Sequence, residues 1–267
     1  MSRDRIARRD VESSSGAVTS DELVVEEPLE IRVAGDTVAV TMRTPGDDPD
    51  LVLGFLFAEG VVRSLADVGT ITHCGRPGEE GYGNVVDVLP GPGVVLVVDG
   101  ARRGTLTTAS CGVCGRRTIA DLMARCRPVT STARLPRALV HGAAERLAAA
   151  QIVFARTGGL HGALLLDESG ATLAAAEDVG RHNAVDKVIG AALRAGTLAR
   201  GALLFVSGRT SFEIVQKAAV AGIPAIAGVS AASTLAVDLA REMGITLAGF
   251  VRGERATFYA HPERMAR

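Results

Sequence analysis

Hydrophobic and polar positions alternate along much of the N-terminal part of the chain, which is the pattern of strands with one buried face. Residues 29–42 follow it, and residues 83–98 follow it on both sides of the turn 90–93 (PGPG), which predicts a β-hairpin. Between them, residues 47–59 have a helical pattern with an acidic start and a stop at Gly60. We therefore expect residues 23–103 to form a β-rich α+β segment.

From Pro136 onward, predicted strands and helices alternate. Residues 136–150 have amphipathic helical periodicity, and short apolar runs then alternate with longer helical patterns. The predicted strands are 163–166, 172–176, 202–207, 225–229, 246–251 and 256–259, and the predicted helices are 182–195, 211–221 and 230–243. Aromatic residues make up only 3% of the chain, so Ala, Val, Leu and Ile must build the core, which suits α/β layers. We expect residues 118–267 to form a three-layer α/β core.

The ends and the charge of the chain narrow the function classes. Residues 1–22 mix arginine with acidic residues and hold no apolar segment, which predicts a flexible tail that is neither a signal peptide nor an anchor. The uncharged run 218–237 is long enough to cross a membrane, but Pro224 and flanking glycines divide it into helix, strand and helix. A formal net charge of −1 argues against a general nucleic-acid-binding protein. We expect a cytoplasmic protein that binds neither nucleic acid nor membrane.

The most reactive feature is a Cys-x-x-Cys pair, Cys111 and Cys114, in a predicted loop at 104–117. Small and hydroxylated residues surround the pair, and Arg116 and Arg117 follow it. Nearby arginines lower the pKa of a thiol, and an exposed loop makes the thiolate accessible. The pair therefore favours thiolate chemistry.

Three other interpretations compete for the pair. A structural zinc site needs a second pair of ligands, but the other two cysteines, Cys74 and Cys126, have no paired spacing, so we expect no tightly held metal. A structural disulfide is disfavoured in a chain that has four cysteines and no secretory signal. A thioredoxin-like redox pair would begin a helix, which residues 116–126 are able to form, but the thioredoxin composition around it is absent. We interpret Cys74 and Cys126 as ordinary packing residues.

A second candidate feature is the turn between the predicted strand 202–207 and the helix after it. Thr210 and Glu213 have the spacing of a capping box, and a strand that leads through glycine into a helix exposes backbone N–H groups that suit an anion. An ordinary well-capped turn is an equally good interpretation. The chain has no Walker or dinucleotide fingerprint, so ATP or NAD chemistry is not indicated.

Several separated motifs give the chain a resemblance to the formate dehydrogenase accessory sulfurtransferase (FdhD) family. The motifs occur in the family's order from about residue 25 to the C-terminus, which makes chance similarity improbable. They are CGVCG at 111–115, TGGLHGA at 157–163, EDVGRHNAVDK at 177–187, SGR at 207–209 and GIP at 222–224.

The resemblance implies a sulfur carrier that takes sulfur from a cysteine desulfurase as a persulfide. The carrier delivers this sulfur to the molybdenum cofactor, bis-molybdopterin guanine dinucleotide, for formate dehydrogenase. The resemblance also implies a homodimer with a cytidine deaminase-like core, in which Cys111 holds the persulfide and Cys114 assists. The family's cofactor-binding segment falls on Phe250, Val251, Arg252, Gly253, Glu254 and Arg255. Arginine forks suit phosphates and the glycine permits close backbone approach, although a solvated turn is the alternative.

Two other functions remain to be weighed. A zinc-dependent deaminase requires His-x-Glu, whereas His161 is followed by Gly162 and Ala163, so deamination is disfavoured. A non-catalytic chaperone that only binds the cofactor would tolerate loss of both loop cysteines. We expect His161 to be a structural residue, and we expect His182 either to contact a ligand or partner subunit or to cap a helix.

Overall fold

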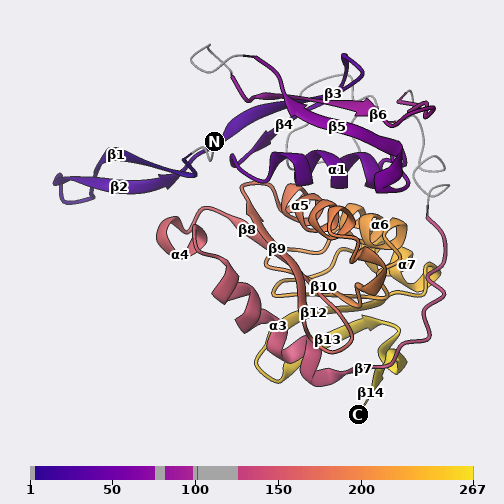
Figure 1. Cartoon of the computed structure of the whole chain (residues 1–267). Coiled ribbons are helices and arrows are strands. Elements are labelled where there is room, and N and C mark those ends of the chain that lie inside the picture. The colour runs from indigo at the N-terminus through magenta and orange to yellow at the C-terminus, as the bar shows by residue number, and fades with distance from the viewer. Residues whose placement is uncertain (1–3, 76–81, 99–100, 102–125, 267) are drawn as a thin grey trace.

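The computed structural model describes residues 4–75, 82–98, 101 and 126–266. Within these residues an N-terminal unit lies on one side of a larger α/β core (Figure 1). The loop that holds Cys111 and Cys114, with Arg116, Arg117 and most of the predicted helix 116–126, lies outside the described residues.

The core is built on a six-stranded sheet in the order β13-β12-β11-β10-β8-β9. Strands β10, β11 and β12 are parallel to one another, and the other neighbours are antiparallel. The strands are β8 (His161–Leu166), β9 (Thr172–Asp178), β10 (Leu203–Val206), β11 (Ala225–Gly228), β12 (Thr246–Arg252) and β13 (Arg255–Ala260). The carboxyl ends of β10, β11 and β12 therefore meet at one edge of the sheet, together with the end of β9 and the start of β8.

Successive side chains along the buried strands enter two different hydrophobic clusters, because a strand points them to opposite faces. Leu204 and Val206 pack in the cluster formed with α5 (Arg181–Arg194), α6 (Phe212–Val220) and α7 (Thr234–Glu242). Leu203 and Phe205 pack on the other face, which α3 (Arg137–Ala150) covers. The sheet with helices on both faces confirms the prediction of a layered α/β core.

The N-terminal unit is a four-stranded sheet in the order β4-β3-β6-β5 with α1 (Asp48–Ala58) on one face. Its strands are β3 (Glu27–Val33), β4 (Asp36–Arg43), β5 (Val68–His73) and β6 (Val85–Pro90). The prediction of a hairpin over 83–98 is wrong, because β6 ends at Pro90 and pairs with β3 and β5. Local alternation identified β6, but its partners are distant in sequence.

The two units meet where α1 crosses α5, and two glycines allow the close approach. A Cβ placed on Gly54 of α1 would lie 1.9 Å from the carbonyl oxygen of Asp186, and one placed on Gly190 of α5 would lie 1.9 Å from that of Asp50. The backbones of the two helices are therefore in direct contact.

No described helix is long and apolar enough to cross a membrane.

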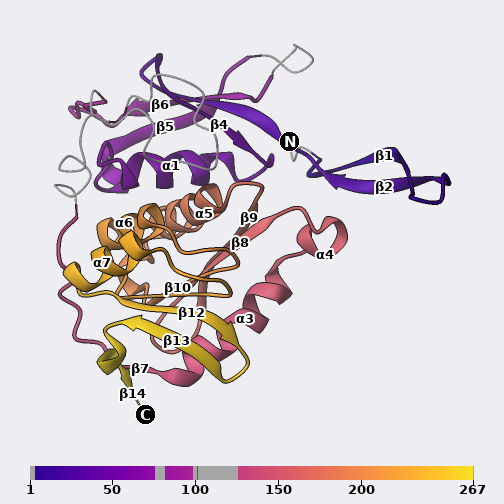
Figure 2. The same ribbon diagram turned by 180° about the vertical axis from the view of Figure 1, so that it is seen from behind.

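Most of the predicted flexible tail is instead a projecting hairpin of β1 (Ile6–Glu12) and β2 (Val18–Val24), which Figure 2 shows beside α4 (Phe154–Thr157). Arg156 anchors it, since its guanidinium donates to both carboxylate oxygens of Glu22 at 2.7 and 2.9 Å. The sequence pattern did not predict this hairpin, because charged residues occupy both of its faces. Elsewhere, β7 (Leu135–Pro136) pairs in parallel with β14 (Met265–Ala266), and the short helices are η1 (Leu65–Asp67), η2 (Leu198–Arg200) and η3 (Pro262–Arg264).

Candidate functional site

Three of the sequence motifs named above converge on one edge of the core sheet. Ser207 follows β10 at this edge, and its backbone N–H donates to Gly162 O while its hydroxyl accepts from Gly162 N, both at 2.9 Å. The end of β9 pairs there with the start of β8, since Asp178 lies opposite His161. The motifs at 157–163, 177–187 and 207–209 thus form one surface, which is a favoured ligand position in open α/β sheets.

Part of the motif 177–187 is structural. The ammonium group of Lys187 is completely buried, and it lies 2.8 Å from the carboxylate of Asp178 and donates to Thr44 O at 2.9 Å. Asn183 donates to Met42 O at 2.7 Å. These residues join the core to the end of β4, so they hold the site in place and leave the remaining motif residues to face the edge.

Two arginines give the edge a positive charge. Arg181 begins α5 and is half-buried, and its Nε has no hydrogen-bond partner among the described residues. Burial and the nearby positive charge of Arg209 lower the pKa of Arg181, while Glu213 opposes this effect. Arg209 is exposed in the loop after β10. A half-buried arginine beside a second arginine favours an anion at this position.

His161 belongs to the same edge, although we expected only a structural role for it. Its Nδ1 lies 3.2 Å from where a Cβ on Gly208 would be, and the same Cβ would lie 3.7 Å from Arg181 Cδ. Burial first, and then the charge of Arg181, lower the pKa of His161, with Asp178 acting in the opposite direction. The imidazole is therefore held toward its neutral form, in which it has one donor and one acceptor for a ligand.

Within the described part of the chain, three helices begin at this edge. The first residues of α5, α6 and α7 are Arg181, Phe212 and Thr234, each within or just after a strand-to-helix connection. Their free N–H groups and partial positive charge add to the attraction for an anion. These groups favour an anion site, and not only an ordinary capped turn, between β10 and α6.

The expected capping box of Thr210 and Glu213 is absent. Ser211, not Thr210, is the N-cap of α6, and its hydroxyl makes no capping hydrogen bond. It instead lies 3.0 Å from Nε2 of His182, whose Nδ1 lies 3.6 Å from the carboxylate of Glu213. Tertiary contact with His182 therefore overrides the local capping pattern.

The segment predicted to bind the cofactor forms the β12–β13 hairpin beside this edge. Phe250 has a left-handed backbone (φ 51°) within a β-bulge, and its N–H donates to Ser230 O at 3.1 Å. The residue is 47% exposed. Arg252 and Arg255 lie opposite each other and are exposed on either side of the turn formed by Gly253 and Glu254. Val251 differs from the other residues of the segment 250–255, because it is 1% exposed and packs in the hydrophobic cluster under α3. Its side chain supports the hairpin and faces away from any ligand there.

The described residues include no group of three or more His, Cys, Asp or Glu side chains placed to hold a metal ion. Cys74 and Cys126 are both half-buried, and Cys126 packs against the main core cluster. Cys111 and Cys114 are not among the described residues. The absence of a zinc site at the loop therefore stays a prediction.

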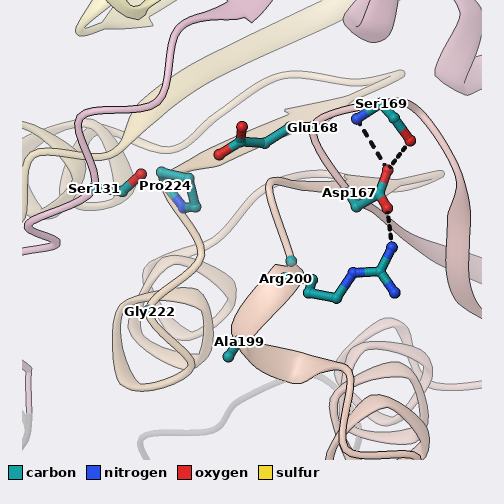
Figure 3. A pocket seen from close by; sticks show the side chains of 9 residues that line it. Ser131, Asp167, Glu168, Ser169, Ala199, Arg200, Gly222 and Pro224 are labelled. Atoms are coloured by element: carbon teal, nitrogen blue, oxygen red, sulfur yellow. Dashed lines mark hydrogen bonds and ion pairs between the residues drawn. The ribbon is translucent and has the colours of Figure 1, made fainter.

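A cavity of about 540 Å³ lies at the opposite edge of the sheet, at the starts of β10 and β11 (Figure 3). Asp167 in its wall accepts hydrogen bonds from Ser169 at 2.6 Å and from Arg200 at 2.5 Å, so its charge is already compensated. Glu168 extends across the cavity toward Pro224. This cavity holds none of the residues that converge on the first edge.

Comparison with known proteins decides the family. The model of the FdhD/NarQ family matches residues 24–266. The chain belongs to this family. Curated FdhD relatives named "Sulfur carrier protein FdhD" include one from Anaeromyxobacter dehalogenans (strain 2CP-C), 58% identical, with 97% of this chain and 93% of that protein covered. Others come from Mycobacterium tuberculosis (strain ATCC 25618 / H37Rv), 49% identical over 95% of each chain, and from Streptomyces avermitilis, 47% identical over 100% and 97%.

The fold is also similar to a solved structure. A crystal structure of a putative formate dehydrogenase accessory protein from Desulfotalea psychrophila superposes with a TM-score of 0.76 at 24% identity, covering 98% of each chain. At this identity the similarity supports the fold, and the resemblance stated from the FdhD motifs is confirmed by the family match.

The convergence of Arg181, Arg209 and Ser211 on one edge of the sheet was not predicted from the sequence. A signal was present, because the motifs GRH and SGR each place an arginine where a strand passes into a helix. The sequence does not reveal the order of strands in the sheet, and this order brings the two turns side by side.

Proposed function

We propose that this protein is a sulfur carrier that accepts sulfane sulfur on Cys111 and passes it to a molybdenum cofactor. The observation that carries the proposal is the family match over residues 24–266, which spans both loop cysteines, together with relatives that are named sulfur carriers. A donor persulfide, supplied by a cysteine desulfurase, is attacked by the Cys111 thiolate at its outer sulfur. The new S–S bond to Cys111 forms as the bond to the donor sulfur breaks, and the donor leaves as a thiolate. Cys114, three positions further along the chain, then assists release.

The acceptor in this proposal is bis-molybdopterin guanine dinucleotide, the cofactor of formate dehydrogenase, which this chain binds as cargo. Its pyrophosphate groups suit the positive edge of the sheet, where Arg181 and Arg209 meet three helix N-termini. Phe250 offers an exposed aromatic face beside that edge, and Arg252 and Arg255 add guanidinium groups at the hairpin turn. We propose a homodimer as the acting form.

Sulfur loading is tested by intact-mass analysis after incubation with a cysteine desulfurase and cysteine. The wild type should gain one sulfur atom that dithiothreitol removes, and Cys111→Ala should gain none. Cys126→Ala is the matched control, because Cys126 packs against the core, and it should load like the wild type. If Cys111→Ala still gains one reducible sulfur to the wild-type extent, the assignment of the acceptor thiol is wrong.

Cofactor binding is tested by titration with GDP as a partial mimic. The double change Arg252→Ala and Arg255→Ala removes charge-assisted hydrogen bonds worth roughly 1.5 to 3 kcal/mol each, so affinity should fall at least ~10-fold. Sulfur loading on Cys111 should not change. Arg8→Ala on the projecting hairpin is the control, since Arg8 pairs with Glu22 away from the edge. Unchanged GDP affinity in the double variant would place the cofactor elsewhere.

A non-catalytic cofactor chaperone is the second candidate. It is favoured by one observation, that the described residues of the positive edge supply groups for an anion and include no cysteine. Formate dehydrogenase activity in cells that carry the Cys111→Ala and Cys114→Ala double variant separates the two functions. A sulfur carrier loses activity in this variant, whereas a chaperone retains it.

A further inference from the structure

Ser211 has a contact that its position in the sequence does not predict. A serine at a helix N-cap ordinarily accepts a hydrogen bond from a backbone N–H of the first turn. The Ser211 hydroxyl makes no such bond and lies 3.0 Å from Nε2 of His182. Ser233, the N-cap of the neighbouring helix α7, does cap its helix, since its hydroxyl accepts from Ala236 N at 3.3 Å. Two N-cap serines on one edge of the sheet thus have different partners.

A carboxylate lies near the other ring nitrogen of His182. Nδ1 of His182 lies 3.6 Å from Oε2 of Glu213, which is an ion-pair distance and longer than a hydrogen bond, and both side chains are 9% exposed. Glu213 also lies 3.6 Å from the ammonium group of Lys217, one turn further along α6. Lys217 in turn bonds both carboxylate oxygens of Asp186 at 2.7 and 2.8 Å. The Lys217 ammonium group therefore lies next to two carboxylates, those of Asp186 and Glu213.

The order hydroxyl, imidazole, carboxylate is that of an activated nucleophile. A base within hydrogen-bond reach of a hydroxyl, oriented by a third group, defines such a site, and the distances are often longer without substrate. Because the Ser211 hydroxyl is turned to His182, the first N–H groups of α6 stay available to an oxygen anion. Arg181 and Arg209 supply positive charge at the same edge. Together these groups suit attack on a phosphorus centre.

We propose that Ser211 is a nucleophile toward phosphodiesters, with His182 as its general base and Glu213 as the residue that positions the imidazole. In the reaction, the Ser211 Oγ–P bond forms and the bond from phosphorus to the leaving oxygen breaks. The hydroxyl proton passes to His182 Nε2 and then to the leaving oxygen. Water attacks the phosphoryl-serine in the reverse sense and restores the free hydroxyl. This activity uses the positive edge of the proposed cofactor site but requires no sulfur on Cys111.

The test is covalent labelling of the whole protein with an alkyl fluorophosphonate, read by intact mass and peptide mapping. The Oγ–P bond forms as the P–F bond breaks, and fluoride leaves. One label per chain on Ser211 is expected, and bis(4-nitrophenyl) phosphate should slow labelling by competing for the site. Ser211→Ala should remove the label, while Ser233→Ala, a serine change at the neighbouring N-cap, should label like the wild type. An unlabelled wild type, or equal labelling of Ser211→Ala, would overturn the proposal.

The roles of the other two residues have separate readouts. His182→Ala should lower the labelling rate by at least ~100-fold, as expected when a general base is lost, and added imidazole should restore part of it. Glu213→Gln keeps the shape of the side chain, so it should lower the maximal labelling rate without changing the half-saturating probe concentration. Wild-type labelling rates in both variants would show that the contacts are only structural. Sulfur loading on Cys111 should be unchanged in every variant, which separates this test from that of the proposed sulfur transfer.

Discussion

Replacing Gly54 by alanine should force α1 of the N-terminal unit away from α5 of the core and so destabilise the protein. The added Cβ would lie 1.9 Å from the carbonyl oxygen of Asp186, whereas ordinary contacts begin at 3.4 Å. The atom it meets is backbone inside α5, which has no rotamer with which to move aside. The helices must therefore separate by about 1.5 Å, which removes close packing along the whole crossing.

The cost follows from the kind of contact that is lost. Overpacking a well-packed core costs typically 1–3 kcal/mol and sometimes more, and here both partners are backbone, so we expect a loss of about 3 kcal/mol or more. For a chain of this size, each kcal/mol lowers the thermal midpoint by roughly 2–4 °C, so the midpoint should fall by about 6 °C or more. Differential scanning calorimetry, with urea unfolding as a second probe, measures this change.

The control is Gly142→Ala in α3, where an added Cβ meets nothing within 4 Å. Alanine is a better helix former than glycine, so this variant should gain roughly 0.5–1 kcal/mol. Both substitutions exchange glycine for alanine, yet their changes in the free energy of unfolding should have opposite signs. Equal midpoints for Gly54→Ala and Gly142→Ala would refute the reasoning. Gly190→Ala should resemble Gly54→Ala, and the double variant should lose less than the sum, because the helices are already apart after the first change.

Three further predictions concern single side chains. Lys187→Met leaves the buried Asp178 carboxylate without its cation, so urea unfolding should show a loss of about 3–5 kcal/mol; a loss under 1 kcal/mol would contradict the buried pair. Burial by itself would raise the pKa of Asp48, but hydrogen bonds from His73 and a neighbouring arginine lower it overall. The ionised Asp48 therefore stabilises the fold above the pKa of an unfolded carboxyl group, and this contribution is lost as the pH falls through the lower folded pKa. Acid unfolding of Asp48→Asn should therefore show a shallower loss of stability below about pH 5 than the wild type, and parallel curves would exclude this role. Ser233→Ala removes the cap of α7 and should cost about 1 kcal/mol by thermal unfolding, with no change if the cap bond contributes nothing.

The elements whose pattern is local can be predicted from the amino-acid sequence alone. The helix at α1 and the strands β10 and β11 follow from periodicity, since a short apolar run bounded by glycine, serine and proline has few alternatives. The ordered set of motifs, beginning with the pair Cys111 and Cys114, also determined the family, because their order along the chain is itself sequence information. No three-dimensional contact was needed for either conclusion.

Which of these elements contact one another is seen only in the folded chain. Strand β6 pairs with β3 and β5, and the charged strands β1 and β2 pair with each other, because pairing depends on long-range contacts that periodicity does not encode. Arg181 and Arg209 share one edge because β9 and β10 both border β8. Ser211 leaves its capping role because His182 lies within reach from another helix. A side chain's preference for a nearby backbone partner can be overridden by a side chain from a distant part of the chain. The folded arrangement of strands and helices determines which distant side chain comes within reach.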